Sequence, residues 1–203
     1  DYLWRIKLEA IRRAADDAPG HICYLDTDIA AHAALAGLAA RLDAGCCLMH
    51  LREGELARSR RRSHRRFRSA IAGMALDGAP VAADVAMWNA GVIAVPAAQR
   101  GAIDRALATC DALVARTGSH MLCEQFACSL VLSRIGLEPA SPWIRHYWGN
   151  KPNWQRTIAA RLADALIAGG PTHLIEIART RPIDLPEQVR RRWWNRLAQR
   201  WAV

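Results

Sequence analysis

Short apolar runs of strand length alternate with longer segments of helical period along this chain of 203 residues. Strands are predicted at residues 21–25, 46–51, 92–95 and 143–148. Helices are predicted between and around them, at residues 2–15, 30–42, 97–116, 119–134 and 154–168, with a last helix from residue 186 to the C-terminus. This alternation favours an α/β fold in which helices cover both faces of a sheet.

The composition favours one helix-rich domain. Apolar residues make up 52% of the chain but aromatic residues only 6%, and alanine carries much of the apolar share, which argues against an all-β sandwich. A chain of this length can bury a substantial core. No apolar stretch reaches the ~18–20 residues that cross a bilayer, and no secretory pattern opens the chain, so a soluble cytoplasmic protein is expected.

The cysteines agree with a reducing compartment. No two of them have the spacing of a metal-binding or redox pair. Most lie in apolar surroundings, where a free thiol behaves as a small hydrophobic side chain. We therefore expect buried thiols at Cys23, Cys46, Cys47, Cys110, Cys123 and Cys128.

Two aspartates, Asp26 and Asp28, directly follow the first predicted strand. On an extended backbone, residues two apart point to the same side, with their Cα atoms ~6.5–7 Å apart. Two carboxylates placed in this way can share one divalent cation and leave coordination sites for diphosphate oxygens. Ligands of open α/β sheets also collect outside the carboxyl ends of strands. Taken alone, the pair fits a solvated turn or a helix cap equally well.

Three later segments accompany the aspartates in an order that a known family shares. The four pieces are Tyr24-Leu25-Asp26-Thr27-Asp28-Ile29, Trp88-Asn89-Ala90-Gly91-Val92, Glu124-Gln125 and His146-Tyr147-Trp148-Gly149-Asn150-Lys151-Pro152. Together they resemble the GT-A glycosyltransferases, particularly glycosyltransferase family 8, over roughly residues 3–155. The resemblance implies a GT-A-like mixed sheet flanked by helices, and an enzyme whose donor is a nucleotide-diphosphate sugar, with a UDP-sugar expected.

The resemblance implies a metal centre. Asp26 and Asp28 would hold Mn²⁺ or Mg²⁺, and His146, from a late loop, would be the third ligand; a histidine with an ordinary hydrogen bond is the alternative. Carboxylate and imidazole together suit Mn²⁺ better than Ca²⁺. The metal would neutralise charge on the leaving nucleoside diphosphate. Gly149 would let the backbone approach a phosphate and Lys151 would add a point charge, although the family places its lysine one residue later.

Further residues are implied to contact the donor. Thr27 lies between the two aspartates and joins them in the donor-binding set. Asn89, Ala90 and Gly91 match the family's turn beside the donor sugar, where an amide can both donate to and accept from a hydroxyl. A β-bulge, or a turn that needs a positive φ at Gly91, would explain the same three residues.

An adjacent glutamate and glutamine, together with one basic residue near the N-terminus, complete the implied site. Glu124 and Gln125 take the place of an Asp-Gln pair that binds or faces the transferred sugar, and they are the catalytic candidates. Glutamate keeps the charge of aspartate but reaches further. Upstream, related enzymes often carry a basic residue that touches the donor, and Lys7 is preferred to Arg5 for this role. A solvated helix face is the alternative for both.

Two arginine-rich segments contribute to the formal net charge of +9. Residues 58–68 form a basic run followed by a predicted helix to residue 74; such a run is usually solvated, but it could meet an anionic acceptor or a membrane surface. Near the C-terminus, Trp194, Leu197 and Trp201 share one helix face among arginines. This pattern fits a helix on an anionic membrane, at the inner face, and equally a helix docked on the protein's own core.

The resemblance also predicts how the chain is organised. Residues 1–185 would form a GT-A-like catalytic domain that lacks its N-terminal nucleotide-binding portion, since only 25 residues precede Asp26, and residues 186–203 would form an amphipathic helix. The expected activity is sugar transfer to a glycan or lipid-linked hydroxyl. The alternatives are a basic module that binds RNA or an anionic surface, and an inactive relative of the family. No RNP, KH or helix-turn-helix pattern supports specific nucleic-acid binding.

Overall fold

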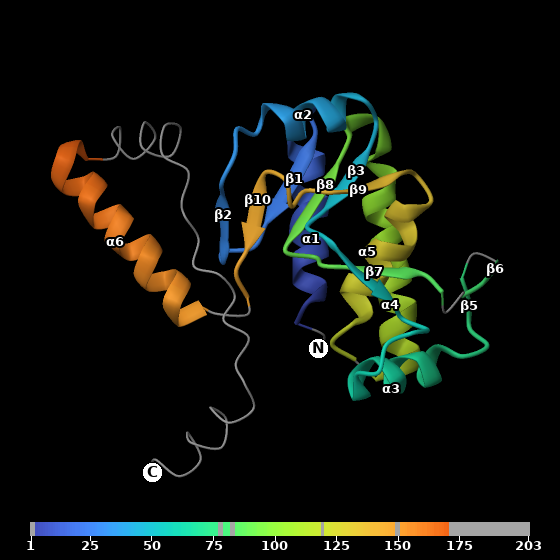
Figure 1. Cartoon of the computed structure of the whole chain (residues 1–203). Coiled ribbons are helices and arrows are strands. Elements are labelled where there is room, and N and C mark those ends of the chain that lie inside the picture. The colour runs from blue at the N-terminus through green and yellow to red at the C-terminus, as the bar shows by residue number, and fades with distance from the viewer. Residues whose placement is uncertain (1–2, 77–78, 82–83, 119, 149–150, 171–203) are drawn as a thin grey trace, which may run out of the picture. The chain divides into compact units, whose positions relative to one another are not determined.

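The computed structural model describes residues 3–76, 79–81, 84–118, 120–148 and 151–170 (Figure 1). The chain divides into two compact units, Asp1–His146 and Tyr147–Val203. The first unit is built on a mixed four-stranded sheet with helices, and the described part of the second contains one long helix. The prediction of an α/β fold with a mixed sheet is therefore confirmed.

The central sheet consists of β1 (Ile22–Leu25), β8 (Val92–Val95), β3 (Cys47–Met49) and β9 (Leu137–Pro139), in that spatial order. β8 is antiparallel to both β1 and β3, whereas β3 and β9 run parallel. Every residue of β8 and β3 is buried. A strand covered on both faces needs apolar side chains on both, which explains why these two strands read as continuous apolar runs.

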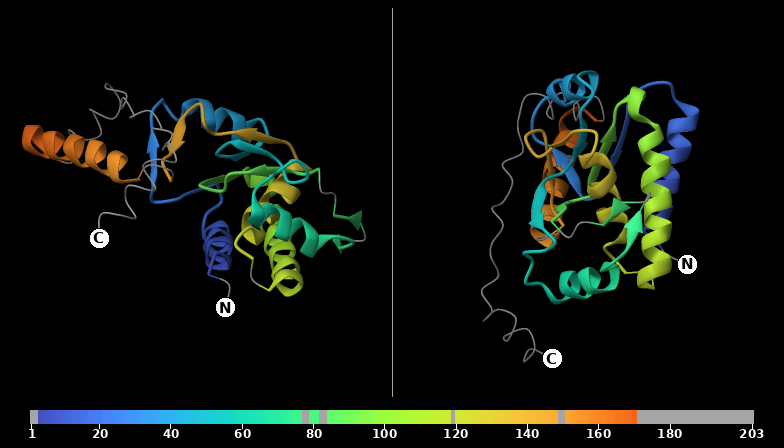
Figure 2. Two further views of the ribbon diagram at one scale, coloured as in Figure 1. Left: turned by 60° about the horizontal axis from the view of Figure 1, so that its bottom comes forward. Right: turned by 90° about the vertical axis from the view of Figure 1, so that its right-hand side faces the viewer.

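Different helices cover the two faces of this sheet. The larger core includes residues of α1 (Arg5–Asp17), α4 (Gly101–Thr117) and α5 (Cys123–Ser133), together with Ile93 and Val95 of β8. The smaller core includes residues of α2 (Ala36–Asp43), together with Val92 and Ala94. Successive residues of β8 thus enter opposite cores, as the alternation along a strand requires. Figure 2 shows α2 and the α1–α4–α5 layer on opposite sides of the sheet.

Residues 30–42 do not form the single helix that was predicted. Ile29–Ala31 forms β2, and α2 begins only at Ala36. β2 pairs in antiparallel register with β10 (Ile144–His146), with Ile29 opposite His146. Alanine favours helix, but this long-range pairing outweighs the local preference. The pairing places His146 beside Ile29, the residue that follows Asp28, so it brings the histidine close to that aspartate.

The remaining elements of the first unit lie at the edge of the large core. β4 (Arg52–Glu55) pairs antiparallel with β7 (Ala86–Trp88), and its register shifts between Arg52 and Gly54. α3 (Arg62–Ile71) begins within the basic run of residues 58–68 and contains most of it, whereas the helix was predicted to follow that run and reach residue 74. The short strands β5 (Ala75–Leu76) and β6 (Ala79–Pro80) pair with each other, and the 3₁₀ turn Ala97–Gln99 precedes α4.

The second unit contains α6 (Lys151–Gly169), which matches the helix predicted at residues 154–168. Tyr147 stacks on Trp154 with ring centroids 5.4 Å apart. The arginine- and tryptophan-rich segment from residue 186 onward lies outside the described residues, and so does Gly149. Among the residues that are described, none of the helices combines the length and the apolar character that crossing a bilayer requires.

All six cysteines are free thiols. Four of them are buried, as predicted: Cys47, Cys110, Cys123 and Cys128. Burial raises the pKa of Cys110 to about 12 and that of Cys47 to about 11, so these two thiols stay protonated and act as small core residues. Cys46 is half-buried, and Cys23 is exposed against the expectation.

Candidate metal centre

Asp26, Asp28 and His146 converge at one edge of the first unit. Each offers one ligand atom, and these atoms all lie within 4.8 Å of one another. His146 Nε2 is 3.0 Å from Asp28 Oδ1 and 3.7 Å from Asp26 Oδ2. Two donor atoms that each lie ~2.1 Å from an ion, at right angles, are ~3 Å apart, so the three can hold one divalent cation after a small adjustment. The structure thus brings together the three residues predicted as metal ligands.

A turn, not an extended backbone, brings the two aspartates together. Asp26 follows β1 and its backbone N–H donates to the Gly91 carbonyl at 2.9 Å. Thr27 and Asp28 lie in a turn, and β2 begins at the next residue. The expectation that strand alternation orients both carboxylates is therefore wrong, although the carboxylates still converge. The turn joins β1 to β2. Because β1 is paired with β8 and β2 with β10, both ends of the turn are held in place.

Asn89 orients the imidazole of His146. The Asn89 side-chain NH₂ donates to Glu53 Oε1 at 3.1 Å, which fixes Oδ1 on the opposite side of the amide. Asn89 Oδ1 accepts from the Gly91 N–H at 3.0 Å and lies 2.7 Å from His146 Nδ1. Because an amide oxygen can only accept, His146 carries a hydrogen on Nδ1. When neutral, the ring therefore has its lone pair on Nε2, the atom that faces the aspartates, as metal-binding histidines require.

Burial favours the neutral form of this histidine. It lowers the pKa of His146, although Asp28 and Asp26 oppose the effect. The neighbouring His50 accepts the His146 backbone N–H on Nε2 at 3.1 Å, and burial lowers its pKa to about 4. A neutral His146 places its Nε2 lone pair next to two carboxylates. Either a second proton on the ring or a cation relieves that repulsion, and burial disfavours the proton.

Gly91 leaves the space that His146 fills. Gly91 is not among the glycines with positive φ, and the register shift of the strands lies between Arg52 and Gly54 instead. A Cβ atom at Gly91 would lie 2.6 Å or less from three ring atoms of His146. The alternative explanation, a positive φ or a bulge at Gly91, is therefore wrong. Glycine is needed here because the imidazole packs directly against its Cα.

Lys7 connects the metal centre to Glu124. Its Nζ lies 3.2 Å from Asp26 Oδ1 and 3.3 Å from Glu124 Oε1, and it donates to the Ala90 carbonyl at 3.1 Å. Burial raises the pKa of Glu124 to about 7, against the lowering effect of Lys7. Burial also tends to lower the pKa of Lys7, but Glu124 and Asp26 outweigh it and the net shift is upward. Glu124 can therefore exchange a proton near neutral pH while Lys7 stays charged.

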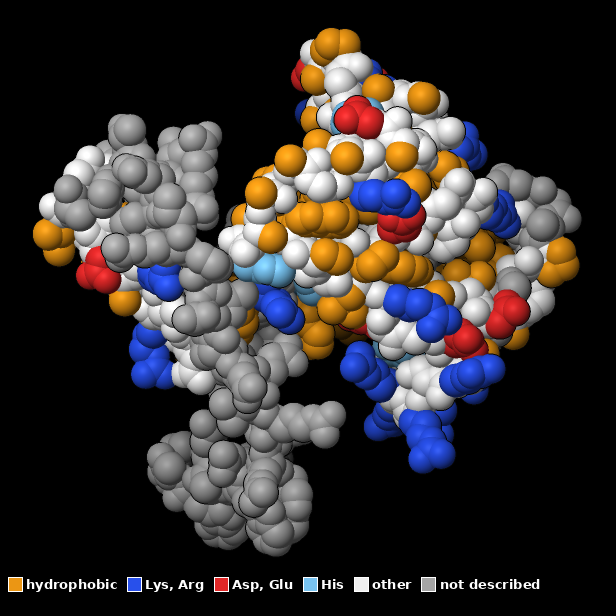
Figure 3. All heavy atoms as spheres, turned by 45° about the horizontal axis from the view of Figure 1, so that its top comes forward, with side chains coloured by type: hydrophobic (Ala, Val, Ile, Leu, Met, Phe, Trp, Pro, Cys, Tyr) orange, Lys and Arg blue, Asp and Glu red, His pale blue; other side chains and the backbone are white. Residues whose placement is uncertain are grey.

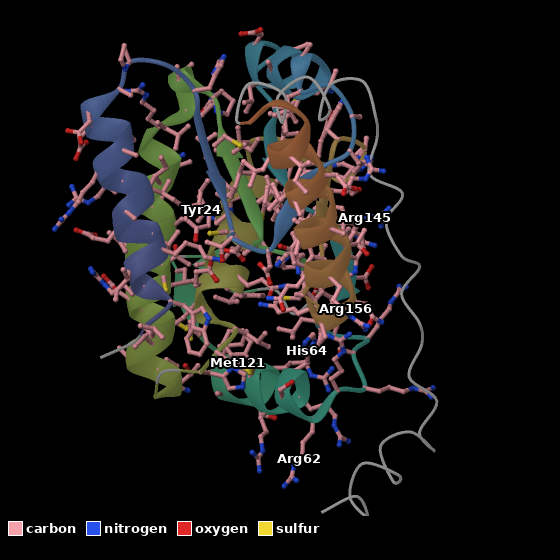
Figure 4. The ribbon with its side chains drawn as sticks, turned by 90° about the vertical axis from the view of Figure 1, so that its left-hand side faces the viewer. Tyr24, Arg62, His64, Met121, Arg145 and Arg156 are labelled. Atoms are coloured by element: carbon pink, nitrogen blue, oxygen red, sulfur yellow. The ribbon has the colours of Figure 1, made fainter. Side chains whose placement is uncertain are left out.

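Neighbouring contacts decide between Lys7 and Arg5. Arg5 forms a two-point ion pair with Asp111, with contacts of 2.6 and 2.9 Å, on the outer side of α1 and α4. Lys7 instead lies over the Tyr24 ring at 5.2 Å, and the Tyr24 hydroxyl donates to Asp26 Oδ1 at 3.0 Å. Figure 4 labels Tyr24, whose side chain extends from β1 into the first unit. Of the two basic residues considered, Lys7 is the one that lies at the metal centre.

Glu53 links two of the predicted residues, although no motif in the sequence includes it. Its Oε2 accepts from Gln125 Nε2 at 3.1 Å while its Oε1 accepts from Asn89. The carboxylate of this β4 residue thus joins the residue that follows β7 to α5. The only sequence signal was an acidic residue shortly after a predicted buried strand, within Arg52-Glu53-Gly54-Glu55, and that signal is too common to be distinctive.

The other predicted donor contacts are less fully placed. Thr27 lies within the turn between the two aspartates, and Ala90 takes part through its carbonyl oxygen. Lys151 is an exposed residue that begins α6 in the second unit. Gly149 lies outside the described residues. The roles of Lys151 and Gly149 at a diphosphate therefore stay predictions.

Comparisons with known proteins assign no family to this chain. No family model, no curated protein and no solved structure matches it. The resemblance to GT-A glycosyltransferases therefore rests on the sequence motifs alone and stays a prediction.

Proposed function

We propose that this chain is a metal-dependent glycosyltransferase, or the catalytic part of one, that moves a sugar from a nucleotide-diphosphate sugar to a hydroxyl of a glycan or lipid-linked acceptor. The observation that carries the proposal is the grouping of Asp26, Asp28 and His146, with Nε2 of the histidine set toward the aspartates by Asn89. Three protein ligands leave coordination positions for phosphate oxygens. Mn²⁺ is the expected ion and a UDP-sugar the expected donor.

The reaction places different demands on the residues around the metal. The acceptor oxygen bonds to the anomeric carbon, the bond from that carbon to the diphosphate breaks, and the nucleoside diphosphate leaves with the electron pair. Bound metal supplies charge neutralisation for that leaving group. Lys7 contacts both Asp26 and Glu124, and its positive charge reduces the repulsion between these carboxylates and an anionic donor. Glu124, whose pKa is about 7, is the group suited to take the proton released by the acceptor hydroxyl.

The positions of the predicted sugar-facing residues refine their roles in this proposal. Asn89 acts mainly on His146, because its oxygen serves both Gly91 and the imidazole and its NH₂ serves Glu53. Glu124 and Gln125 lie in the first turn of α5, where Glu124 contacts Lys7 and Gln125 contacts Glu53. Lys151 begins α6 in the second unit, and its role as a charge for the diphosphate stays a prediction.

Calorimetric titration with Mn²⁺ and then UDP tests the metal centre. Asp28→Ala is expected to weaken Mn²⁺ binding at least about tenfold and to abolish metal-dependent UDP binding, because it removes one of three ligands. Asp17→Ala is the matched control: it removes the same charge from the exposed end of α1 and should change neither. Metal-dependent UDP binding that persists in Asp28→Ala would contradict the site. UDP release from UDP-sugars with an added acceptor then tests transfer itself.

A second candidate function is binding to an anionic surface, and the arginines of α3 favour it. Arg62, Arg65, Arg66 and Arg68 line an open hollow on this helix. Figure 3 shows basic side chains gathered over the same part of the molecule. Sedimentation with anionic liposomes is expected if this surface meets a membrane. A chain that ends at residue 185 tests the C-terminal segment: undiminished sedimentation would remove that segment's membrane role and leave the α3 surface as the contact.

A further inference from the structure

The two carboxylate oxygens of Asp26 have different surroundings. Oδ1 accepts a hydrogen bond from the Tyr24 hydroxyl at 3.0 Å and lies 3.2 Å from Lys7 Nζ, whereas Oδ2 lies 3.7 Å from Nε2 of the metal ligand His146. We propose that Tyr24 and Lys7 hold Oδ1, so that Asp26 binds an ion through Oδ2 alone, and that this restriction makes the site select Mn²⁺ over Ca²⁺. The inference rests on the metal centre of the proposed function and adds the residues that set its ion preference.

The contacts at Oδ1 of Asp26 use its whole capacity to accept. An ionised carboxylate has about two lone-pair sites on each oxygen. The Tyr24 hydroxyl and the Lys7 ammonium each direct one donor at Oδ1. An ion could therefore bind this oxygen only by displacing one of the two donors. Oδ2, which faces the imidazole, is the oxygen that Asp26 offers to an ion.

Lys7 is fixed by contacts on all of its donors. Its Nζ donates to the Ala90 carbonyl at 3.1 Å and lies 3.3 Å from Glu124 Oε1, in addition to its contact with Asp26. An ammonium has three donors, so each of them has one oxygen. The side chain is only 13% exposed, and moving it away would leave the buried Glu124 without this charge. The contact between Lys7 and Oδ1 should therefore persist when an ion enters the site.

Tyr24 is fixed by the central sheet. It lies in β1, where it pairs with Ile93 of β8, and its ring packs partly buried against the larger core. Figure 4 shows its side chain extending from the strand into the first unit. Nζ of Lys7 lies 5.2 Å from the centre of the ring, so the two residues that hold Oδ1 also contact each other. Strand pairing and the cation–π contact thus keep the hydroxyl aimed at Asp26.

A carboxylate limited to one oxygen affects Ca²⁺ and Mn²⁺ differently. Ca²⁺ takes about six to eight oxygen ligands and often binds a carboxylate through both oxygens. Mn²⁺ suits a near-octahedral set of single donor atoms. The imidazole of His146 already favours Mn²⁺, but the restriction at Asp26 is a separate effect, because it acts on a carboxylate and does not involve the histidine. Releasing Oδ1 should therefore improve Ca²⁺ binding relative to Mn²⁺ while His146 stays in place.

Calorimetric titration with Mn²⁺ and, separately, with Ca²⁺, both without nucleotide, measures the ratio of the two affinities. The wild type is expected to bind Mn²⁺ at least about tenfold more tightly than Ca²⁺. Tyr24→Phe removes the hydroxyl but keeps the ring, and it should narrow this ratio about threefold. Lys7→Met should narrow the ratio about tenfold, because it removes a charged donor. The loss of the lysine charge should also raise the affinity for both ions, and the ratio cancels that common effect.

Arg5→Met is the matched control. It removes the same charge from the same helix, where Arg5 pairs with Asp111, and it should leave the ratio unchanged. Since Tyr24→Phe keeps the ring in the core, it tests the inference even if Lys7→Met does not fold.

Four results would overturn the inference. They are binding of neither ion, Ca²⁺ binding as tightly as Mn²⁺ in the wild type, the wild-type ratio in Tyr24→Phe or Lys7→Met, and equal narrowing by Arg5→Met and Lys7→Met, which would indicate only a general effect of charge. Because the titrations contain no nucleotide, a failure of UDP binding or sugar transfer would contradict the proposed function and leave this inference standing. An unchanged ratio together with intact Mn²⁺-dependent UDP binding would overturn this inference alone.

Discussion

Replacing Gly91 with alanine is a direct test of the packing that holds His146 in place. The added Cβ would lie 2.6 Å or less from three atoms of the imidazole. Ordinary contacts between carbon atoms are ~3.5–4.0 Å, so the ring or the backbone has to move by ~1 Å. Overpacking of this kind costs about 1–3 kcal/mol of folding stability. The displaced ring also loses its hydrogen bond to Asn89, and we expect Mn²⁺ affinity to fall about 10–100-fold.

Two measurements separate the loss of stability from the loss of the metal ligand. Thermal unfolding reports the strain, and calorimetric titration with Mn²⁺ below the unfolding temperature reports the metal centre. Gly20→Ala is the matched control, because no atom lies within 4 Å of a Cβ built there and it should change neither quantity. In a His146→Ala background the ring is gone, so the additional cost of Gly91→Ala should largely disappear.

Two results would refute this account of Gly91. If Gly91→Ala binds Mn²⁺ as tightly as the wild type, His146 is not held against the glycine. If Gly91→Ala costs as much stability in the His146→Ala background as alone, the clash is with something other than the imidazole. Either result would remove His146 packing as the reason for glycine at this position.

Two further predictions follow from the groups around the metal centre. Glu53→Gln keeps the size of the side chain but presents an NH₂ to Asn89 or Gln125, both of which donate to Glu53. The Asn89 amide should therefore lose its fixed orientation, and calorimetry should show about tenfold weaker Mn²⁺ binding. Unchanged affinity would exclude Glu53 as a support for His146. Burial raises the pKa of Glu124 from 4.5 to about 7, so between these values the folded protein binds more protons than the unfolded chain. The free energy of unfolding should therefore fall as pH rises through that window, and Glu124→Gln should flatten the dependence in denaturant titrations; an equal slope in both proteins would assign it to other groups.

Part of the metal centre was predictable because its residues follow local patterns. An apolar run that ends in two aspartates indicates a strand and a polar edge, and both are present at β1, Asp26 and Asp28. The prediction of His146 as the third ligand came from a resemblance between motifs, since 118 positions separate it from Asp28. The β2–β10 pairing that makes them neighbours was hidden, because each strand has only three residues and the alanines around β2 favour helix.

The supporting contacts were not predictable, since each depends on a side chain from another part of the chain. Gly91 was expected to lie in a turn beside the donor sugar, and the neighbour that the structure shows is a ring from β10. Asn89 was expected to face the sugar, and its partners are Glu53 and His146. A sequence pattern can indicate that a polar residue follows a strand. It cannot indicate which buried carboxylate or imidazole completes that residue's hydrogen bonds, because tertiary packing decides this.

The register of β2 and β10 decides whether the metal centre exists at all. Ile29 lies opposite His146 and Ala30 opposite Arg145, and along β10 the histidine is buried whereas the arginine is exposed. A slip of one residue would exchange the two faces of the strand and turn Arg145 toward Asp26 and Asp28. A guanidinium has no lone pair to offer and stays protonated, so it would pair with the aspartates and exclude a cation. The three-residue pairing therefore places a side chain that could hold a metal ion at this position, instead of a charge that would exclude one.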